Sequence, residues 1–226
     1  MNTVYLLILT TLVSIANLYA NPSIYGPTGL IEIPTAESIA YKQVNFAVDY
    51  AIENNDEDSE KNNNKVYYKF NLGSFENWEL GILGGNFLDE GVFVNTKYFL
   101  MSNEEENPLT VAAGIERLGS KKDLAAYLVT SKRFQDGLNA HFGFKAFLQN
   151  NLFAAALFGM EYFLDEKISF LGDLSGERGH KYVLNVGTKI FIDSDVSLRV
   201  YVVDLTKSRE AKETIYTFGI AYNRYI

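Results

Sequence analysis

The chain of 226 residues carries 28 acidic and 20 basic side chains, for a formal net charge of −8, and it contains no cysteine. This balance argues against a nucleic-acid partner, because a phosphate-binding surface needs clustered Lys and Arg. The absence of cysteine excludes disulfides and thiolate metal sites. The length fits one barrel or sandwich, and 15 Tyr, 16 Phe and 17 Gly with only 4 Pro are typical of a chain built from many strands.

The first 20 residues form an apolar, uncharged run that ends in Leu18-Tyr19-Ala20. A small residue after an apolar core is typical of a secretory signal, so we expect residues 1–20 to be a signal peptide with cleavage after Ala20. The usual basic residue near the start is missing, and an uncleaved anchor is the alternative. No later run reaches the roughly 18 apolar residues of a membrane-spanning helix, which excludes a helical membrane protein.

Residues 21–40 contain Pro22, Pro27 and Pro34. Proline cannot donate the hydrogen bonds that a central strand needs. We therefore expect this segment to stand apart from the sheet, either as a plug inside a lumen or in contact with a periplasmic partner.

From residue 41 onward, runs that alternate between apolar and polar residues are separated by polar breaks. A period of two is typical of strands, and the runs have the roughly nine to eleven residues of a tilted transmembrane strand. Residues 123–134 are the one serious candidate for a helix, although strands are predicted on both sides of them. The predicted strands are 41–53, 65–73, 77–84, 91–101, 108–117, 123–133, 138–148, 151–163, 167–175, 181–192, 195–205 and 214–225.

Short breaks alternate with longer ones along the chain, which is typical of outer-membrane barrels with short periplasmic turns and long external loops. The stretch 53–64 is the longest break and is rich in Asp and Asn. It lacks the ordered ligand spacing and the central Gly of an EF-hand. We interpret it as a solvated external loop.

The two faces of the predicted strands differ in chemistry. One face is apolar, as at Phe142, Val200 and Phe218, whereas the other carries ionisable side chains and most mid-strand glycines. The glycines of this second face are Gly73, Gly81, Gly114, Gly143, Gly159, Gly187 and Gly219, with Gly84 and Gly172 as exceptions. Glycine fits the concave side of a closed sheet, where large side chains converge and need small neighbours. The partition predicts charge inside and apolar side chains against lipid.

The side chains that we expect to line the lumen are Lys69, Glu79, Lys97, Glu116, His141, Lys145, Glu161, Asp173, Lys189 and Arg199. The basic members could bind an anionic saccharide or bias a pore. The acidic members nearly match them in number, which favours pairing among themselves. The ion pairs that we expect between adjacent strands, which we call rungs, are Lys145 with Glu161, Lys69 with Glu79, and Asp173 with Lys189.

The sequence therefore predicts an all-β fold, a closed antiparallel up-and-down transmembrane β-barrel of about 12 strands over residues 41–226. Closure is required in hydrocarbon, because an open sheet edge would leave unpaired N–H and C=O groups. Tyr and Trp near the strand ends, such as Trp78 and Tyr162, suit the membrane interface. The predicted location is the outer membrane of a Gram-negative type of cell, and the expected lumen is too narrow for a wide general pore.

The stretch IYGPTGLIEIPTAESI, residues 24–39, contains a Gly-x-x-Gly-Leu-Ile-x-x-Pro-Thr-Ala pattern. It resembles the opening of the YjbH-like outer-membrane proteins, and the later runs NWELGI, VNTKYFL, LNAHFGF and FGMEYFLDEKISFLGDLSG resemble the strands of that family. The resemblance implies an outer-membrane barrel connected with exopolysaccharide production or export, and it implies no catalytic residue. The chain departs from the expected pattern by lacking a lipobox cysteine and by ending in Tyr225-Ile226 rather than Phe or Trp.

Only His141 and His180 are present for a histidine-based hydrolase. Ser175 or Asp173 could serve as partners of His180, but no nucleophile, base and orienting carboxylate recur at a recognisable spacing. No P-loop or Rossmann fingerprint occurs. We therefore predict a protein that is not an enzyme and that uses no metal and no cofactor.

The leading functional hypothesis is a non-enzymatic outer-membrane barrel that acts in exopolysaccharide production or export. Its expected partners are outer-membrane lipid and polysaccharide or periplasmic export components, without nucleic acid. A narrow porin-like channel for small charged solutes is the alternative, and a barrel-embedded hydrolase is a third hypothesis.

Overall fold

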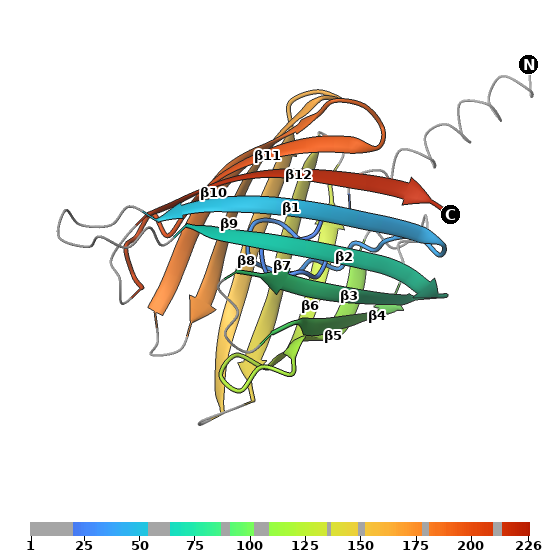
Figure 1. Cartoon of the computed structure of the whole chain (residues 1–226). Coiled ribbons are helices and arrows are strands. Elements are labelled where there is room, and N and C mark those ends of the chain that lie inside the picture. The colour runs from blue at the N-terminus through green and yellow to red at the C-terminus, as the bar shows by residue number, and fades with distance from the viewer. Residues whose placement is uncertain are drawn as a thin grey trace, which may run out of the picture.

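The computed structural model describes residues 20–53, 64–86, 91–101, 109–134, 137–148, 152–177, 181–209 and 214–226. The expected signal peptide lies outside these residues, except for Ala20. Twelve strands run in an up-and-down order, and β12 pairs with β1, so that the sheet closes into a barrel (Figure 1). The strands are β1 (Gln43–Glu53), β2 (Lys65–Phe75), β3 (Trp78–Gly85), β4 (Phe93–Met101), β5 (Leu109–Leu118), β6 (Ala125–Arg133), β7 (Leu138–Phe147), β8 (Phe153–Phe163), β9 (Ile168–Glu177), β10 (Lys181–Phe191), β11 (Val196–Val203) and β12 (Ile215–Tyr225). All neighbouring pairs are antiparallel, which confirms the predicted fold class.

The predicted strand ends are correct to within a few residues, and two of the differences have a backbone cause. The run predicted as 41–53 begins at Gln43 because Lys42 has φ of 63°, and the run 195–205 ends at Val203 because Asp204 has φ of 58°. Left-handed backbone interrupts the ladder of a strand. The strand predicted over residues 123–133 is confirmed against the helical alternative, since Ala125–Arg133 forms β6.

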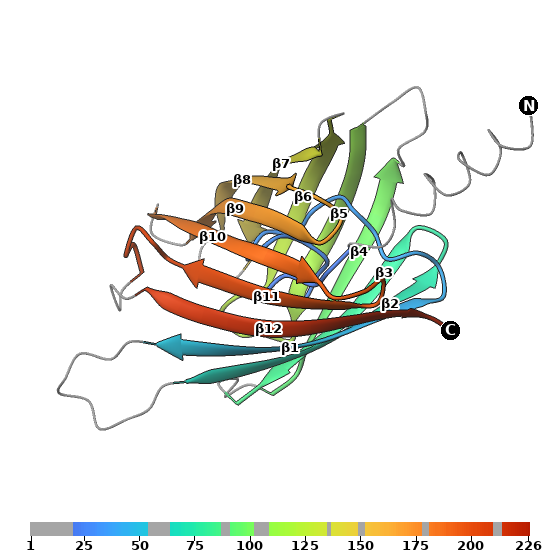
Figure 2. The same cartoon turned by 90° about the horizontal axis from the view of Figure 1, so that it is seen from above.

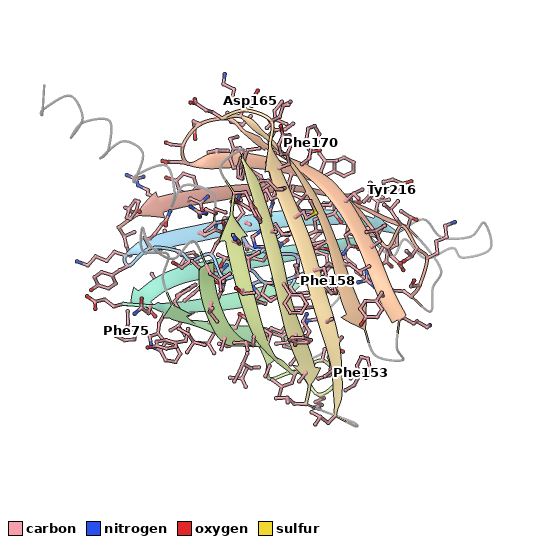
Figure 3. The ribbon with its side chains drawn as sticks, turned by 180° about the vertical axis from the view of Figure 1, so that it is seen from behind. Phe75, Phe153, Phe158, Asp165, Phe170 and Tyr216 are labelled. Atoms are coloured by element: carbon pink, nitrogen blue, oxygen red, sulfur yellow. The ribbon has the colours of Figure 1, made fainter. Side chains whose placement is uncertain are left out.

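Apolar side chains cover the outside of the barrel and ionisable ones face the inside. Phe142 and Phe218 are 38% and 48% exposed, whereas Lys145 and Arg199 are 3% and 1% exposed. Figure 3 shows the same outer face at Phe158, Phe170 and Tyr216. Within the described ranges, no helix is long and apolar enough to cross a membrane.

The mid-strand glycines lie where the partition predicts. A methyl group added at Gly219 would lie 1.8 Å from Asp49 Oδ1, and one added at Gly159 would lie 2.4 Å from Leu30 Cδ1 inside the barrel. The two expected exceptions, Gly84 and Gly172, have open surroundings, with their nearest atoms at 3.9 and 3.8 Å. Glycine therefore marks the crowded concave side.

The two mouths of the barrel differ in their connections. At the mouth that we call the short-turn mouth, β2 is joined to β3, β8 to β9 and β10 to β11, and β1 begins beside the end of β12. At the opposite, long-loop mouth, β1 is joined to β2, β5 to β6 and β11 to β12. In outer-membrane barrels the short turns face the periplasm and the long loops face outward.

Candidate functional site

Residues 20–40 form a folded segment inside the barrel, which we call the plug. Figures 1 and 2 show it as a blue trace enclosed by the strands from two directions. Most of its side chains are buried, and Ile31 and Glu32 are 0% and 1% exposed. The sequence left open whether this segment plugs the lumen or contacts a periplasmic partner, and in the structure it lies inside the lumen.

The plug is a looped-back segment whose two ends lie at the short-turn mouth. At its start, Asn223 near the end of β12 donates to Asn21 Oδ1 at 3.2 Å, and Asn45 near the beginning of β1 donates to the Ala20 carbonyl at 3.2 Å. At its end, Lys42 N donates to the carbonyl of Gly73, near the end of β2, at 2.9 Å. Backbone hydrogen bonds hold the segment together in between, including Ile24 N to Ile31 O at 2.7 Å. The middle of the plug points toward the long-loop mouth, where Glu32 meets a loop residue.

Asp173 on β9 binds the backbone of the plug. Its Oδ2 accepts hydrogen bonds from the N–H groups of Ile31, Glu32 and Ile33 at 2.9, 2.8 and 3.2 Å. Three successive N–H groups directed at one carboxylate form a backbone nest that favours negative charge. The other oxygen, Oδ1, accepts from Asn185 on β10 at 2.6 Å.

Lys97 and Glu79 clamp the plug from the opposite wall. They are paired directly across β4 and β3, and Lys97 Nζ lies 3.4 Å from Glu79. The ammonium group also donates to the carbonyls of Thr28, Thr35 and Glu37 at 2.8, 3.0 and 3.0 Å. Glu79 in turn accepts from Thr28 N at 2.8 Å. This pair is thus satisfied largely by plug atoms.

A third cluster is centred on Asp49 of β1, which pairs with both Lys69 of β2 and Arg199 of β11. Lys69 also donates to Ser23 O at 2.9 Å, and Arg199 donates to Pro22 O at 2.7 Å. The Asp49–Arg199 pair spans β12 at Gly219, the position that lies opposite both residues in the ladder. A side chain there would occupy the space that the pair needs.

The remaining predicted residues form further contacts inside the barrel. Lys145 pairs with Glu116 at 2.6 Å, and Lys189 pairs with Glu161 at 3.3 Å. His141 Nδ1 lies 2.7 Å from Ser131 Oγ, and that oxygen accepts from Ala36 N of the plug at 2.9 Å. All ten predicted side chains are therefore buried on the inner face, and none is isolated.

The three predicted rungs are wrong in their pairing. Lys145 lies opposite Ala155, Lys69 opposite Leu83, and Asp173 opposite Asn185. The sequence identified the charged face correctly. The turns and closure of the barrel set the register, so the residue opposite each of these three side chains is four or more positions away from the predicted one.

Two acidic residues and a loop arginine were missing from the predicted set. Asp49 shares the period-two face of β1 with Asn45 and could have been found from that alternation. Glu32 lies in the plug and pairs with Arg209 of the β11–β12 connection at 2.6 Å. No local pattern brings these two together, because 177 positions separate them in the chain.

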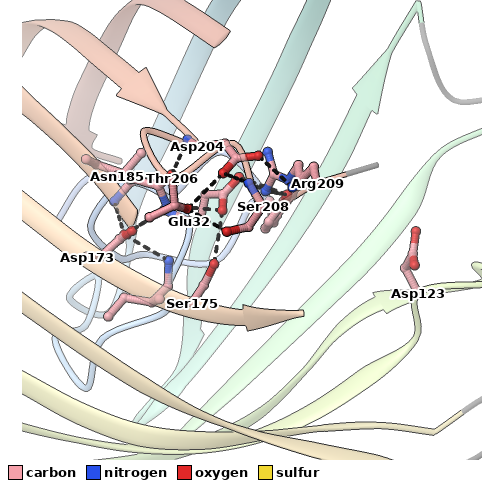
Figure 4. Close-up of polar contacts among 12 residues, drawn as sticks. Glu32, Asp123, Asp173, Ser175, Asn185, Asp204, Thr206, Ser208 and Arg209 are labelled. Atoms are coloured by element: carbon pink, nitrogen blue, oxygen red, sulfur yellow. Dashed lines mark hydrogen bonds and ion pairs between the residues drawn. The ribbon is translucent and has the colours of Figure 1, made fainter. Parts of the chain in front are cut away.

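Glu32 is the most densely bonded acid of the plug (Figure 4). Tyr25, Ser175 and Asn185 donate to it at 2.9, 3.1 and 3.1 Å, besides Arg209. Burial disfavours its ionised form, but the charge and hydrogen bond of Arg209, with those of Tyr25 and Asn185, outweigh burial and lower the pKa of Glu32. Glu32 is therefore ionised at neutral pH.

The serine and aspartate proposed as partners of His180 are bonded elsewhere, and the hydroxyl beside His141, Ser131 Oγ, accepts a hydrogen bond from the plug. Ser175 donates to Glu32, Asp173 binds the plug backbone, and His180 lies outside the described residues. The Asp- and Asn-rich stretch is likewise outside them, apart from Glu53 and Asn64. Among the residues that are described, no group of three or more His, Cys, Asp or Glu is placed to hold a metal ion.

No protein-family model matches the sequence, and no curated protein matches it. Solved structures do match the fold. The KdgM porin is 13% identical with a TM-score of 0.59, covering 79% of this chain and 98% of that one. The NanC porin is 11% identical with a TM-score of 0.59, covering 78% and 98%. Omp33, an outer membrane protein of Acinetobacter baumannii, is 10% identical with a TM-score of 0.51, covering 81% and 98%.

At these identities the likeness shows the fold, and the apolar outer surface shows what surrounds it. The protein is an outer-membrane β-barrel. An outer-membrane barrel must be closed and must present apolar side chains to lipid, as this one does at Phe142, Phe158 and Phe218. The more specific resemblance to YjbH-like proteins stays a prediction.

Proposed function

We propose that this outer-membrane barrel is a narrow channel for small charged solutes and that the plug closes it at rest. The observation that carries the proposal is the occupation of a charged lumen by the chain's own N-terminal segment. Lumen groups such as Asp173, Lys97 and Arg199 are each bonded to plug backbone atoms. A barrel without the plug would expose these groups to water along a central path.

The porin neighbours support a channel more than they support the exopolysaccharide role. One of them is a KdgM porin in complex with disordered oligogalacturonate, 14% identical with a TM-score of 0.58, covering 80% of this chain and 98% of that chain. We extend the proposal to short acidic saccharides as the first solutes to test. Lys69, Lys97 and Arg199 would be freed of their plug carbonyls when the lumen opens.

The exopolysaccharide role and its export partners stay predictions that rest on the sequence resemblance. They are tested by deleting the gene and measuring surface polysaccharide. Unchanged polysaccharide would remove that role and leave the channel proposal standing.

Conductance in planar bilayers tests the channel proposal. We expect residues 21–226 to show rare openings and residues 41–226, refolded without the plug, to show stable openings. Heat-modifiable migration in detergent establishes that both barrels are folded. A folded 41–226 barrel that inserts into the bilayer and does not conduct would contradict the proposal.

A reversible lock provides the matched comparison with the full chain. The protein has no cysteine, so Ala36→Cys with Ser131→Cys introduces one pair at a plug–wall contact where the backbone N and the side-chain oxygen lie 2.9 Å apart. We expect oxidation to abolish the openings and reductant to restore them. The two single-cysteine variants are the controls and should not respond to reductant.

A further inference from the structure

The middle of the plug is held by a residue that does not belong to the barrel wall. Arg209 Nη2 lies 2.6 Å from Glu32 Oε1 and 3.0 Å from Tyr25 OH. The Arg209 side chain is 19% exposed, whereas the Glu32 side chain is 1% exposed. The guanidinium group is therefore the half of this pair that can be reached from the long-loop mouth.

Arg209 is positioned by its own loop through Asp204. The Asp204 carboxylate accepts from the N–H groups of Ser208 and Arg209 at 2.8 and 2.9 Å. Asp204 N donates to Asn185 Oδ1 at 2.9 Å, and the Asn185 amide group donates to both Glu32 and Asp173. Figure 4 shows this continuous set of bonds from the loop through β10 to the plug.

The other strong contacts of the plug come from strands. Asp173, Lys97 and Arg199 lie on β9, β4 and β11, and moving them would break the ladder of the barrel. The connection that carries Arg209 follows the end of β11, and its first residues are bonded to β10, as Leu205 N is to Leu184 O at 2.9 Å and Thr206 Oγ1 to Tyr182 O at 3.2 Å. Arg209 lies beyond these bonds, so its side chain can move while the sheet stays closed. Arg209 is thus a plug contact that a change at the outer mouth can remove.

We propose that the Arg209–Glu32 pair is an outer latch of the plug, and that its release lets the plug leave through the short-turn mouth. The inference rests on the proposed function, because it describes how the closed state is controlled. The direction follows from chain connectivity. The plug continues into β1 at the short-turn mouth, and Asn21 at its other end is bonded there to Asn223 of β12, so only its middle has to travel through the lumen, away from Arg209.

Cysteine labelling measures plug position independently of conductance. Ala36→Cys places a thiol on a buried plug residue in a chain without cysteine. A maleimide carrying a large polyethylene glycol chain cannot enter the plugged lumen and should react slowly. Adding Arg209→Gln should raise the labelling rate about tenfold, the factor that corresponds to losing one charge-assisted hydrogen bond.

Matched variants separate a latch from a general loss of structure. Arg224→Gln removes an exposed arginine of β12 and should leave the rate unchanged. Glu32→Gln should reproduce the effect of Arg209→Gln, and the double variant should be no faster than either single one, because both remove the same pair. Equal labelling rates in the parent and in Arg209→Gln would overturn the latch.

The direction is tested with intact cells and with outer-membrane fragments. Intact cells expose the long-loop face and fragments expose both faces. Ala36→Cys with Arg209→Gln should label in fragments and stay unlabelled in intact cells, and labelling in intact cells would overturn the exit direction. If Arg209→Gln speeds labelling but the 41–226 barrel does not conduct, the channel proposal is refuted and the latch stands. If the 41–226 barrel conducts but Arg209→Gln does not change labelling, the latch is refuted and the channel proposal stands.

Discussion

Several charged side chains of the lumen are each held by more than one partner, as Lys97, Asp173 and Arg199 are. A buried charge is costly unless it is both paired and hydrogen-bonded. Lys97 shows how the cost is offset, since its ammonium group contacts Glu79 and three plug carbonyls. Replacing one partner should therefore cost more than replacing the pair.

The first prediction concerns this pair. Lys97→Met leaves Glu79 buried without its counter-ion and should lower the free energy of unfolding by about 3–5 kcal/mol. Adding Glu79→Gln should recover part of the loss, because it removes the uncompensated charge and the amide oxygen can still accept from Thr28 N, while the plug carbonyls stay without the Lys97 donor. Urea unfolding in detergent, followed by tryptophan fluorescence, measures both. A double variant as unstable as the single one would contradict this account of the pair.

The second prediction concerns the glycine at the crossing of the Asp49–Arg199 pair. Gly219→Ala places a methyl group 1.8 Å from Asp49 Oδ1 and should cost about 1–3 kcal/mol through crowding. Gly172→Ala is the control, since its nearest atom would be 3.8 Å away, and should change stability by less than about 0.5 kcal/mol. The same unfolding assay compares them, and equal effects at the two positions would show that glycine does not mark the crowded face.

At the scale of elements, the strands and the plug differ in how much of them the sequence reveals. Alternation identified all twelve strands, because each strand is apolar toward lipid, whereas its lumen face is mixed and carries the charged side chains along with buried apolar ones such as Leu83 and Leu157. The plug has no such period. Its three prolines excluded it from the sheet, but its binding sites are Asp173, Lys97 and Arg199, which lie far away in the chain.

The third prediction is that acid loosens the plug at Glu32. The pKa of Glu32 is lowered in the folded protein from an ordinary value of 4.5, so its pairing stabilises the plug fully above about pH 4.5 and is lost as the pH falls through the lowered pKa. Arg209 keeps its charge throughout. Labelling of Ala36→Cys should therefore accelerate below about pH 4.5, once corrected for the pH dependence of the thiol reaction.

Glu32→Gln is the control for this acid step, because it removes the titrating group. Among the described groups that face Glu32, Asp173 of β9 is the other carboxylate, whereas Tyr25 and Tyr67 are phenols that stay neutral in acid. Glu37 acts in the same direction, since Arg133 lowers its pKa against the effect of burial. An acid step of unchanged size in Glu32→Gln would assign it to Asp173 or Glu37 instead.

At the scale of the whole molecule, the sequence determined which way the faces point but not which residues meet. The pattern of Phe142 outside and Lys145 inside follows from period-two alternation alone. The partner of Lys145 is Glu116, two strands away across β6, and depends on the register of both pairings. Register is fixed by turn lengths and by irregularities such as the shift between Gly73 and Phe75, which leave no charge signature in the sequence.

The fourth prediction concerns ion selectivity without the plug. The buried charges on the described strands are five basic and five acidic, so their sum is zero. They are Lys69, Lys97, Lys145, Lys189 and Arg199 against Asp49, Glu79, Glu116, Glu161 and Asp173. The 41–226 barrel should therefore show a reversal potential near zero in a KCl gradient, and a strong preference for either ion would contradict a balanced lumen.

Hydrogen exchange of the plug amides tests the central claim most directly, because the claim is that residues 20–40 are bound inside the charged lumen. The amide groups of Ile31, Glu32 and Ile33 all donate to Asp173 in the interior. We predict that they exchange as slowly as the amides of the neighbouring strands when the detergent-solubilised protein is transferred to deuterated buffer. Exchange of these three amides at the rate of an unstructured peptide, from a barrel whose strands stay protected, would contradict the account.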